Sequence, residues 1–336
     1  MVLSPYIYST ALGLLLIMLP IRSDAQSCCS GGSGSPIAGG VSQGVLQDRQ
    51  VELSANFQYI NSNKFFTGDT LTKNFLDNFN SKYLYTRVAY GVTSKLTLSV
   101  ESGYFFNKTQ IGLNKRDTIE DGGFGDLIIF PRYSVWSRNT EKTRSEATVG
   151  IGLKIPIGQH LDSVVVYTDP AGKDYFAPKP SAVMATSGAN DFIFYGFLYH
   201  VLVKQKLNFF TSILYIRKGW NSLGQKFGDF ASVGLFASKS VLKNVGVTLQ
   251  LRGEWIDSMD YDKNIDMLAL YNLDVKSTGG KRLLFVPQLN YSYKNLSVYG
   301  LTEIPLYQYV NGTAIGSQYL FTFGLAYRFM SYKTGG

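Results

Sequence analysis

Charged side chains recur at alternate positions in a series of segments of this chain, and they are the residues whose chemistry is easiest to place. Projecting the alternation puts both signs of charge on one polar face, in the set Glu52, Arg87, Glu101, Asp126, Arg132, Glu146, Lys154, Asp191, Arg252 and Glu254. Unpaired buried charge is costly, so these groups should pair across strands and hold water between them. Two interpretations stay open: ion pairs that close the interior of a barrel, or a ring of charges that selects what passes through it.

The charged residues nearest the middle of their segments are the candidates for a constriction. They are Arg87, Glu101, Arg132, Arg252 and the neighbouring Glu254.

Histidines are too few and too poorly placed for hydrolase chemistry. A lipid-modifying hydrolase on a barrel would need a His and a Ser two residues apart on one strand face, with a polar group to orient the His. His160 lies in the loop-like stretch GQHLDS with Ser163 three residues later, and His200 is followed by Val201 and Leu202. No phosphate loop, nucleotide fingerprint or metal-ligand cluster follows residue 25. The sequence therefore predicts neither an enzyme nor a cofactor.

Cys28 and Cys29 are adjacent in a Gly/Ser tract and cannot staple a fold. They are interpreted as an oxidised or idle pair, with a soft-metal or haem contact as the alternative. The formal net charge is +8, but Lys and Arg are scattered without a basic run. This distribution suits lipid headgroups or lumen charges better than nucleic acid.

The N-terminal region is predicted to direct secretion. An apolar run over residues 12–19 precedes Pro20 and the small-residue site at 23–25, so residues 1–25 are expected to be a signal peptide. Residues 26–48 form a Gly/Ser-rich arm with the Cys-Cys pair, interpreted as a flexible leader or, alternatively, as a plug for the lumen. Residues 49–336 are expected to form one barrel, because no later apolar run is long enough for a membrane helix.

Composition and periodicity predict the fold class. The chain is 14% aromatic, with 23 Tyr, 22 Phe and 34 Gly, as expected where aromatic girdles meet two membrane interfaces. From residue 49 onward, segments of about 12 residues alternate apolar and polar side chains, as membrane strands do. They lie near 49–60, 81–93, 95–107, 124–137, 145–157, 190–203, 207–219, 229–240, 245–257, 281–293, 296–309 and 317–329.

The links between these segments indicate the architecture. Short links follow the even-numbered segments, whereas three long links, near 61–80, 158–189 and 258–280, follow odd-numbered ones. Short periplasmic turns that alternate with long extracellular loops are typical of outer-membrane barrels. We therefore expect an all-β, transmembrane, antiparallel up-and-down barrel of about 12 strands, with 10 or 14 as alternatives, and both termini in the periplasm.

The last segment carries its own signal. Its outward set would be Tyr319, Phe321, Phe323, Leu325, Tyr327 and Phe329. An aromatic strand near the C-terminus resembles the signal that barrel-assembly machinery reads, so this machinery and outer-membrane lipid are expected partners. Pro131, Pro287 and Pro305 cannot donate to a strand ladder and predict bulges or locally unpaired positions.

Four stretches, in order within residues 49–205, resemble the outer-membrane channels associated with meta-pathway phenol degradation: AYGVTSKLTLSVESGYFF, GGFGDLIIFPRYSVW, ATVGIGLKIPIG and SGANDFIFYGFLYH. The resemblance implies a porin-like or fatty-acid-channel-like barrel that admits hydrophobic or aromatic small molecules. It carries over to Gly125, Asp126, Pro156, Gly158 and Asp191 as turn and rim positions, with Asp126 and Asp191 at the extracellular mouth.

Three functions follow as hypotheses. The first is a channel in the bacterial outer membrane for passive uptake of small solutes, of the kind that the resemblance implies. The second is a structural or ligand-binding barrel that does not conduct. The third is a lipid-modifying enzyme, which the two histidines argue against.

Overall fold

The computed structural model describes residues 44–115, 118–266 and 274–331, and it is dominated by long antiparallel strands. Twelve of them form the barrel wall: β1 (Gln50–Ser62), β4 (Leu76–Gly91), β5 (Leu96–Gly112), β6 (Thr118–Asn139), β7 (Thr143–Pro156), β10 (Asp191–Leu202), β11 (Leu207–Arg217), β13 (Phe230–Ser240), β14 (Val245–Ile256), β16 (Gly280–Tyr293), β17 (Leu296–Ile315) and β18 (Tyr319–Met330). Each of the twelve predicted segments corresponds to one of these strands.

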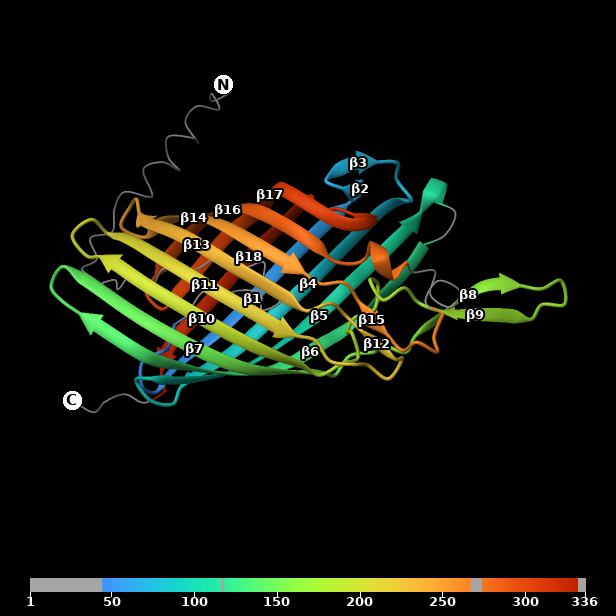
Figure 1. The fold of residues 1–336 in the computed structure, drawn as a ribbon. Coiled ribbons are helices and arrows are strands. Elements are labelled where there is room, and N and C mark those ends of the chain that lie inside the picture. Colours follow the sequence, from blue (N-terminus) through green and yellow to red (C-terminus); the bar gives the residue numbers. More distant parts are fainter. Residues whose placement is uncertain (1–43, 116–117, 267–273, 332–336) are drawn as a thin grey trace, which may run out of the picture.

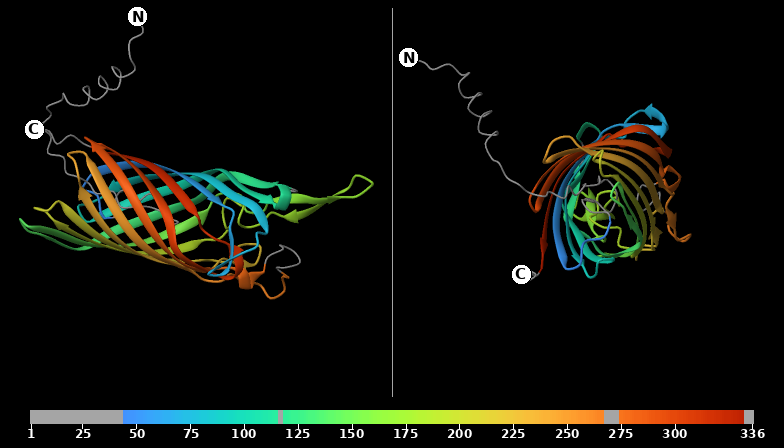
Figure 2. Two further views of the ribbon diagram at one scale, coloured as in Figure 1. Left: turned by 90° about the horizontal axis from the view of Figure 1, so that it is seen from above. Right: turned by 90° about the vertical axis from the view of Figure 1, so that its left-hand side faces the viewer.

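The sheet closes on itself. Each wall strand pairs antiparallel with the next along the chain, and β18 pairs with β1 from Phe329 opposite Val51 to Tyr319 opposite Asn61. Figure 1 shows the strands running obliquely around the barrel, and the end-on view in Figure 2 shows the closed wall. The predicted twelve-stranded up-and-down barrel is confirmed. Among the described residues, no helix is long and apolar enough to cross a membrane.

The two ends of the barrel differ, as the link lengths predicted. One end, called the short-turn end, carries brief connections such as the turn after β4, where the Thr93 hydroxyl accepts from the amides of Lys95 and Leu96 at 3.2 and 3.0 Å. The described N-terminal residues also lie here, because the Arg49 amide donates to the Gly91 carbonyl.

The opposite end, called the long-loop end, carries the small elements β2 (Phe65–Gly68), β3 (Thr70–Thr72), η1 (Leu113–Lys115), β8 (Ser163–Thr168), β9 (Asp174–Pro178), β12 (Gln225–Lys226), β15 (Asp260–Tyr261) and η2 (Val275–Ser277). The β8–β9 hairpin projects well beyond the wall, at the right of Figure 1.

The wall is polar inside and apolar outside, the reverse of a soluble domain. Along β1 the side chains of Glu52 and Asn56 are fully buried, whereas Leu53 and Phe57 are 42% and 39% exposed. The same alternation runs around the barrel, so exposed Val, Leu, Ile, Phe, Tyr and Trp cover its outer surface. A continuous apolar surface on a closed sheet, whose strands have no free edge, suits the hydrocarbon of a bilayer.

The three prolines interrupt the ladder as the sequence predicted. Pro131 pairs with Leu98 on one side, but the ladder to β7 passes from Ile129 directly to Arg132. Pro287 likewise pairs with β14, while the ladder to β17 is open at its position.

Near Pro305 the β16–β17 register shifts by one residue: Leu283 lies opposite Tyr307, and Leu284 lies opposite Pro305. Each proline thus sits where the missing N–H breaks few strand hydrogen bonds.

Candidate functional site

The lumen holds the charged residues that the alternation placed on the polar face. Glu52, Arg87, Glu101, Arg132, Arg252 and Glu254 are all buried inside the barrel, with exposed fractions of 0 to 5%. They gather in two groups on different parts of the wall, and a third group lies near the long-loop end.

The first group centres on Glu52 of β1. Its carboxylate accepts from Arg87 of the neighbouring strand β4 and from Nε of Arg328 in β18, the latter at 2.5 Å. Glu52 lies directly opposite Arg328 in the β1–β18 register, so the strand pairing itself sets this contact. One carboxylate therefore fixes two guanidinium groups across the seam where the barrel closes.

Glu101 and Arg132 extend this group along the wall. Glu101 of β5 accepts from the Tyr85 hydroxyl and from the Ser99 hydroxyl, the latter at 2.7 Å. Arg132 of β6 has Arg87, Glu101 and Glu52 as charged neighbours, and its guanidinium lies 5.7 Å from the ring centroid of Phe130. The packing of an arginine on an aromatic face lowers the cost of holding its charge in a narrow interior.

The second group lies on β14, β16 and β17. Arg252 contacts Glu254 at 2.8 Å and Glu303 at 2.6 Å, and Arg282 donates to the other oxygen of Glu254. Two arginines and two glutamates thus form a chain of contacts with no net charge. Arg282, with 30% of its side chain exposed, is the most accessible member.

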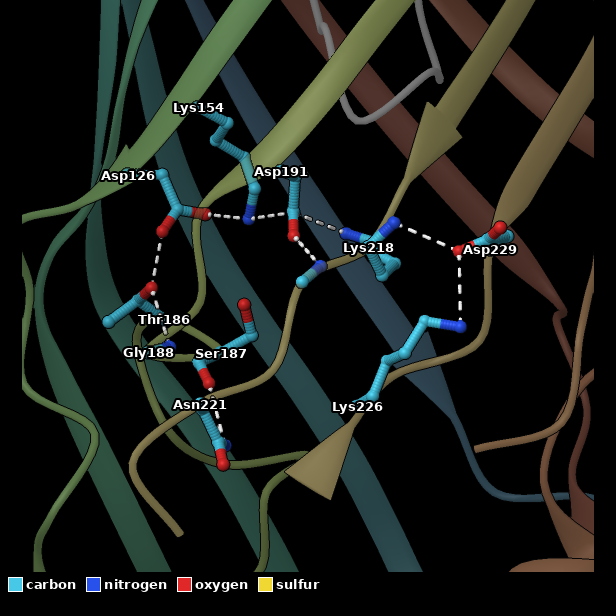
Figure 3. A network of polar contacts seen from close by, with 11 residues as sticks. Asp126, Lys154, Thr186, Ser187, Gly188, Asp191, Lys218, Asn221, Lys226 and Asp229 are labelled. Atoms are coloured by element: carbon cyan, nitrogen blue, oxygen red, sulfur yellow. Dashed lines mark hydrogen bonds and ion pairs between the residues drawn. The ribbon is translucent and has the colours of Figure 1, made fainter. Parts of the chain in front are cut away.

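Asp126 and Asp191 meet through one lysine near the long-loop end. Lys154 of β7 bridges the Asp126 carboxylate at 2.5 Å and the Asp191 carboxylate at 2.8 Å, and Lys218 reaches Asp191 at 2.9 Å (Figure 3). Lys218 follows the end of β11, and its burial, with the nearby Lys154 cation, lowers its pKa. The β7–β10 register places Lys154 directly opposite Asp191, which explains the pairing.

A stretch of the long β7–β10 connection lies inside the barrel beside this group. Residues Val183, Met184, Ala185, Thr186 and Ala189 are all buried, with exposed fractions of 0 to 5%. We call residues 183–189 the inner segment. Two lumen side chains hold it, because Asp126 accepts from the Thr186 hydroxyl and Lys108 Nζ donates to the Met184 carbonyl at 2.6 Å.

The loop after β11 holds the inner segment from another side. Asn221 donates from its side-chain amide to the Ser187 carbonyl at 2.9 Å (Figure 3). Contacts from β5, β6 and the β11 loop thus fix backbone inside the long-loop half of the lumen, where it narrows the space that a solute could use.

Part of the lumen is apolar, beside the charged residues that the alternation placed inside. Ile128, Phe130, Ile193, Leu214, Ile216 and Phe230 form one buried cluster, and Leu284, Val286, Tyr299, Leu301 and Ala326 form another. The first includes Leu214 and Ile216 of β11, a strand whose sequence, LNFFTSILYIR, carries apolar residues on both faces. A segment that is apolar on both faces therefore marks a place where the lumen itself is apolar.

Two glycines make room for this apolar packing. A Cβ on Gly150 or Gly152 would lie 2.9 or 2.8 Å from the ring of Phe130. The ring therefore lies over β7, which could not carry larger inward side chains there.

The described end of the N-terminal arm lies at the short-turn end of the lumen. The Leu46 amide donates to the Thr97 hydroxyl at 2.7 Å, and the Val45 amide donates to Glu146 at 3.4 Å. Leu46 is only 3% exposed. Residues 1–43, which include the predicted signal peptide, Cys28, Cys29 and most of the arm, lie outside the described residues.

The two histidines do not assemble a triad. His160 Nε2 lies 3.2 Å from Ser222 in the long-loop region, and His200 Nδ1 lies 2.9 Å from Ser145 on the outer wall. Within the described ranges, no carboxylate contacts either ring, and no group of three or more metal-ligating side chains occurs.

Several members of the site were missed in the sequence. Glu303, Arg282, Arg328 and Tyr85 belong to the two lumen groups, and the inner segment was expected to be part of an external loop. Glu303 follows Tyr299 and Leu301 at alternate positions of β17, and all three are buried. Once the strand is located in the sequence, the alternation predicts that Glu303 points into the lumen. The inner segment has no comparable periodic signal.

No protein-family model and no curated protein sequence matches the chain. Among solved structures, it is similar to an outer membrane channel from Pseudomonas putida F1, with a TM-score of 0.63 and 11% identity over 85% of this chain and 97% of that one. The beta domain of the Bordetella autotransporter Brka follows, with a TM-score of 0.44 and 9% identity over 84% and 100% of the chains. The first likeness supports the fold, in agreement with the barrel expected from the sequence.

Proposed function

We propose that the protein is a channel of the bacterial outer membrane that admits small solutes, with the short-turn end in the periplasm and the long-loop end outside. The observation that carries this proposal is the set of ionised side chains that line a closed barrel and are fixed by one another. A barrel whose interior served only to fill space could be packed with apolar residues, which need no compensating partners.

The arrangement also sets the order in which a solute would meet the charged groups. It would meet the Asp126–Lys154–Asp191 group and the inner segment first, and the mid-wall groups of Arg252 and Arg87 afterwards. Fixed charges of both signs along such a path set the selectivity of channels. The likeness in fold to an outer membrane channel supports the same function.

Hydrophobic or aromatic solutes remain part of the proposal because the lumen has apolar wall clusters beside its charged groups. A passage with both kinds of lining can bind an apolar body and still hydrate its polar end. Passive movement is part of the same proposal, because fixed side chains that line a passage can bind and release a solute along its concentration gradient.

Planar-bilayer recordings test the proposal. Purified protein should give discrete conductance steps, and Arg252→Trp or Arg87→Trp should make these steps smaller by filling the lumen. Leu235→Trp is the matched control, because Leu235 lies on the outer wall and is 55% exposed. Persistent silence of the intact protein, and of a variant that lacks residues 26–46, would overturn conduction and favour the ligand-binding barrel.

A further inference from the structure

Exposed basic residues gather at the short-turn end of the barrel, at the left of Figure 1. Ten Lys or Arg side chains are exposed on the turns and strand ends there, against two exposed acidic ones, Asp48 and Glu141. We call the ten the basic rim: Arg49, Lys95, Arg138, Lys142, Arg144, Lys204, Lys206, Lys239, Lys243 and Lys294. The whole chain has 32 basic and 24 acidic residues, which leaves 22 of each sign elsewhere. The surplus at this end therefore equals the formal net charge of +8.

The basic rim runs around the whole barrel. The five short turns, after β4, β6, β10, β13 and β16, and the start of β1 each carry at least one of its residues. Backbone hydrogen bonds join these turns to their neighbours, from the amides of Ser134, Val203, Ser292 and Arg328 to the carbonyls of Lys95, Lys142, Asn244 and Asn295. A globular partner would contact one sector of such a ring, whereas a lipid leaflet surrounds all of it.

Exposed aromatic and apolar side chains border the rim. Trp136, two residues before Arg138, is 53% exposed, and Lys294 Nζ lies 5.4 Å from the ring centroid of the exposed Tyr293. Leu242, at the tip of the β13–β14 turn, is also exposed. Trp and Tyr are enriched at the level of lipid headgroups, where lysines cover apolar surface with their stems and keep their charge in water. The rim therefore has the composition of a membrane interface.

The sign of the rim narrows the headgroup class. At the long-loop end cations are paired with carboxylates, as Lys179 is with Asp162 and Lys226 with Asp260, whereas two carboxylates cannot neutralise ten cations at the rim. A zwitterionic headgroup brings its own cation beside its phosphate. An anionic headgroup brings only negative charge, which a cationic surface attracts.

We propose that the basic rim binds anionic phospholipid headgroups, of the class of phosphatidylglycerol, in the leaflet around the short-turn end. Its Lys and Arg side chains donate charge-assisted hydrogen bonds to the phosphate oxygens. The inference rests on the proposed function only for calling this leaflet the periplasmic one, because lipid binding requires neither conduction nor that orientation.

Quenching of tryptophan fluorescence by brominated lipid tests this assignment, because the chain has three tryptophans. The rim reporter carries Trp220→Phe and Trp255→Phe and keeps Trp136, whereas the long-loop reporter carries Trp136→Phe and Trp220→Phe and keeps Trp255. Each is refolded in phosphatidylcholine vesicles that contain a minor fraction of dibrominated phosphatidylglycerol or, in parallel, the same fraction of dibrominated phosphatidylcholine.

Trp136 should report at least about a five-fold preference for phosphatidylglycerol, the factor expected for one basic residue near an anionic lipid surface. Trp255 should report a smaller preference, because Lys281 opposite it in the β14–β16 register is offset by the exposed Asp257 two residues further on. Equal quenching of Trp136 by the two lipids, or an equal preference at Trp136 and Trp255, would overturn the proposal.

Charge neutralisation locates the binding on the rim. Arg138→Gln, Lys142→Gln and Arg144→Gln, combined in the rim reporter, should reduce the preference at Trp136 to near unity. In 1 M NaCl the Debye length falls to about 3 Å, so the preference of the unaltered rim reporter should shrink as well. A preference that survives the triple change would contradict the rim as the binding surface.

The matched control changes three exposed lysines of the long-loop end, Lys64→Gln, Lys73→Gln and Lys115→Gln, and should leave the preference at Trp136 unchanged. A soluble acidic partner is the competing occupant of the rim. Equal quenching by both lipids, together with tight binding of polyglutamate to the protein in phosphatidylcholine vesicles, would assign the rim to such a partner and overturn the lipid.

Folding and conduction are read separately. Each variant is first checked for the shift in gel migration on heating that folded barrels show, and only folded variants are used. A preference for phosphatidylglycerol in a protein that gives no conductance steps would refute the channel and leave this inference intact. Conductance steps without that preference would do the reverse.

Discussion

Lys108 of β5 donates a hydrogen bond from Nζ to the carbonyl oxygen of Met184 over 2.6 Å, and so ties the inner segment to the barrel wall. The lysine also lies 4.9 Å from the ring centroid of Phe105, which helps to fix its direction. The contact joins residues far apart in the sequence and holds irregular backbone inside the long-loop half of the barrel.

Lys108→Met should loosen the inner segment and enlarge the conductance steps. The variant keeps most of the aliphatic stem but removes a hydrogen bond from a charged donor, which contributes about 1.5–3 kcal/mol. Single-channel recording measures the effect, and Lys115→Met, at an exposed lysine near the same rim, is the control. Steps of unchanged size would show that the inner segment does not limit the current.

Glu52→Gln should destabilise the barrel strongly, because it removes the carboxylate that Arg87 and Arg328 share. Breaking a buried ion pair on one side costs about 3–5 kcal/mol. Guanidinium unfolding in phospholipid vesicles, followed by tryptophan fluorescence, measures the loss. Adding Arg87→Met should restore part of it.

Asp48→Asn provides the comparison, because Asp48 and Arg49 form an exposed pair at 3.8 Å. Its effect should stay within about 0.5 kcal/mol. A loss for Glu52→Gln no larger than that of the control would contradict the structural role assigned to Glu52.

Gly152→Ala should destabilise the fold by about 1–3 kcal/mol, as overpacking does in filled interiors. The new Cβ would lie 2.8 Å from the Phe130 ring, so the ring must move. Phe130→Leu in the same chain should relieve part of the strain. Gly300→Ala, whose Cβ would meet nothing within 4 Å, is the matched control in the same unfolding assay. Equal losses for the two glycines would refute the packing argument.

The fold was predictable from the sequence because alternation is local. Residues two apart share a face whatever the strand neighbours are, so Glu52, Arg87 and Arg252 could be placed inside before any register was known. Strand number and link lengths followed from the same periodicity. The three prolines predicted where the strand ladder is interrupted.

The site was only partly predictable because its contacts depend on register and on loop paths. Glu52 meets Arg328 because the first and last strands pair, and the alternation gives no information on which charges will meet. The inner segment enters the lumen through side-chain anchors such as Lys108, which leave no periodic trace.

The base of the β8–β9 hairpin should respond to pH through Lys179. Lys179 bonds the Asp162 carboxylate and lies 3.6 Å from Asp121 of β6. Bonding to Lys179 lowers the pKa of Asp162 below 3.8. Burial alone would lower the pKa of Lys179, but the two carboxylates outweigh it and raise that pKa above 10.5.

The directions of these two pKa shifts define the pH range over which the contact between Asp162 and Lys179 stabilises the hairpin. The contribution of Asp162 is complete above pH 3.8 and is lost as pH falls through its lowered pKa, whereas that of Lys179 is complete below pH 10.5 and is lost as pH rises through its raised pKa. We call the contact between Lys179 and Asp162 the tether of the hairpin. Asp162 is partly solvated, so the tether contributes only about 0.5 kcal/mol to the stability of the hairpin base.

Spin labels on the hairpin tip and the barrel rim, in a chain without the native cysteines, measure the tether as a distance distribution. The distribution should broaden on acidification below pH 3.8. The distance distribution of the Lys179→Met variant should be broad at every pH. A wild-type distribution that stays narrow as pH falls through this range would contradict the tether.

The N-terminal arm gives a last test, at the short-turn end. Because Leu46 is buried and its amide bonds Thr97, we expect the residues around it to obstruct the lumen, as the plug hypothesis holds. Deleting residues 26–46 should enlarge the conductance steps, whereas deleting only residues 26–43 keeps Leu46 and its contact in place. A larger increase for the longer deletion assigns the obstruction to residues 44–46, and steps unchanged in both deletions would exclude a plug.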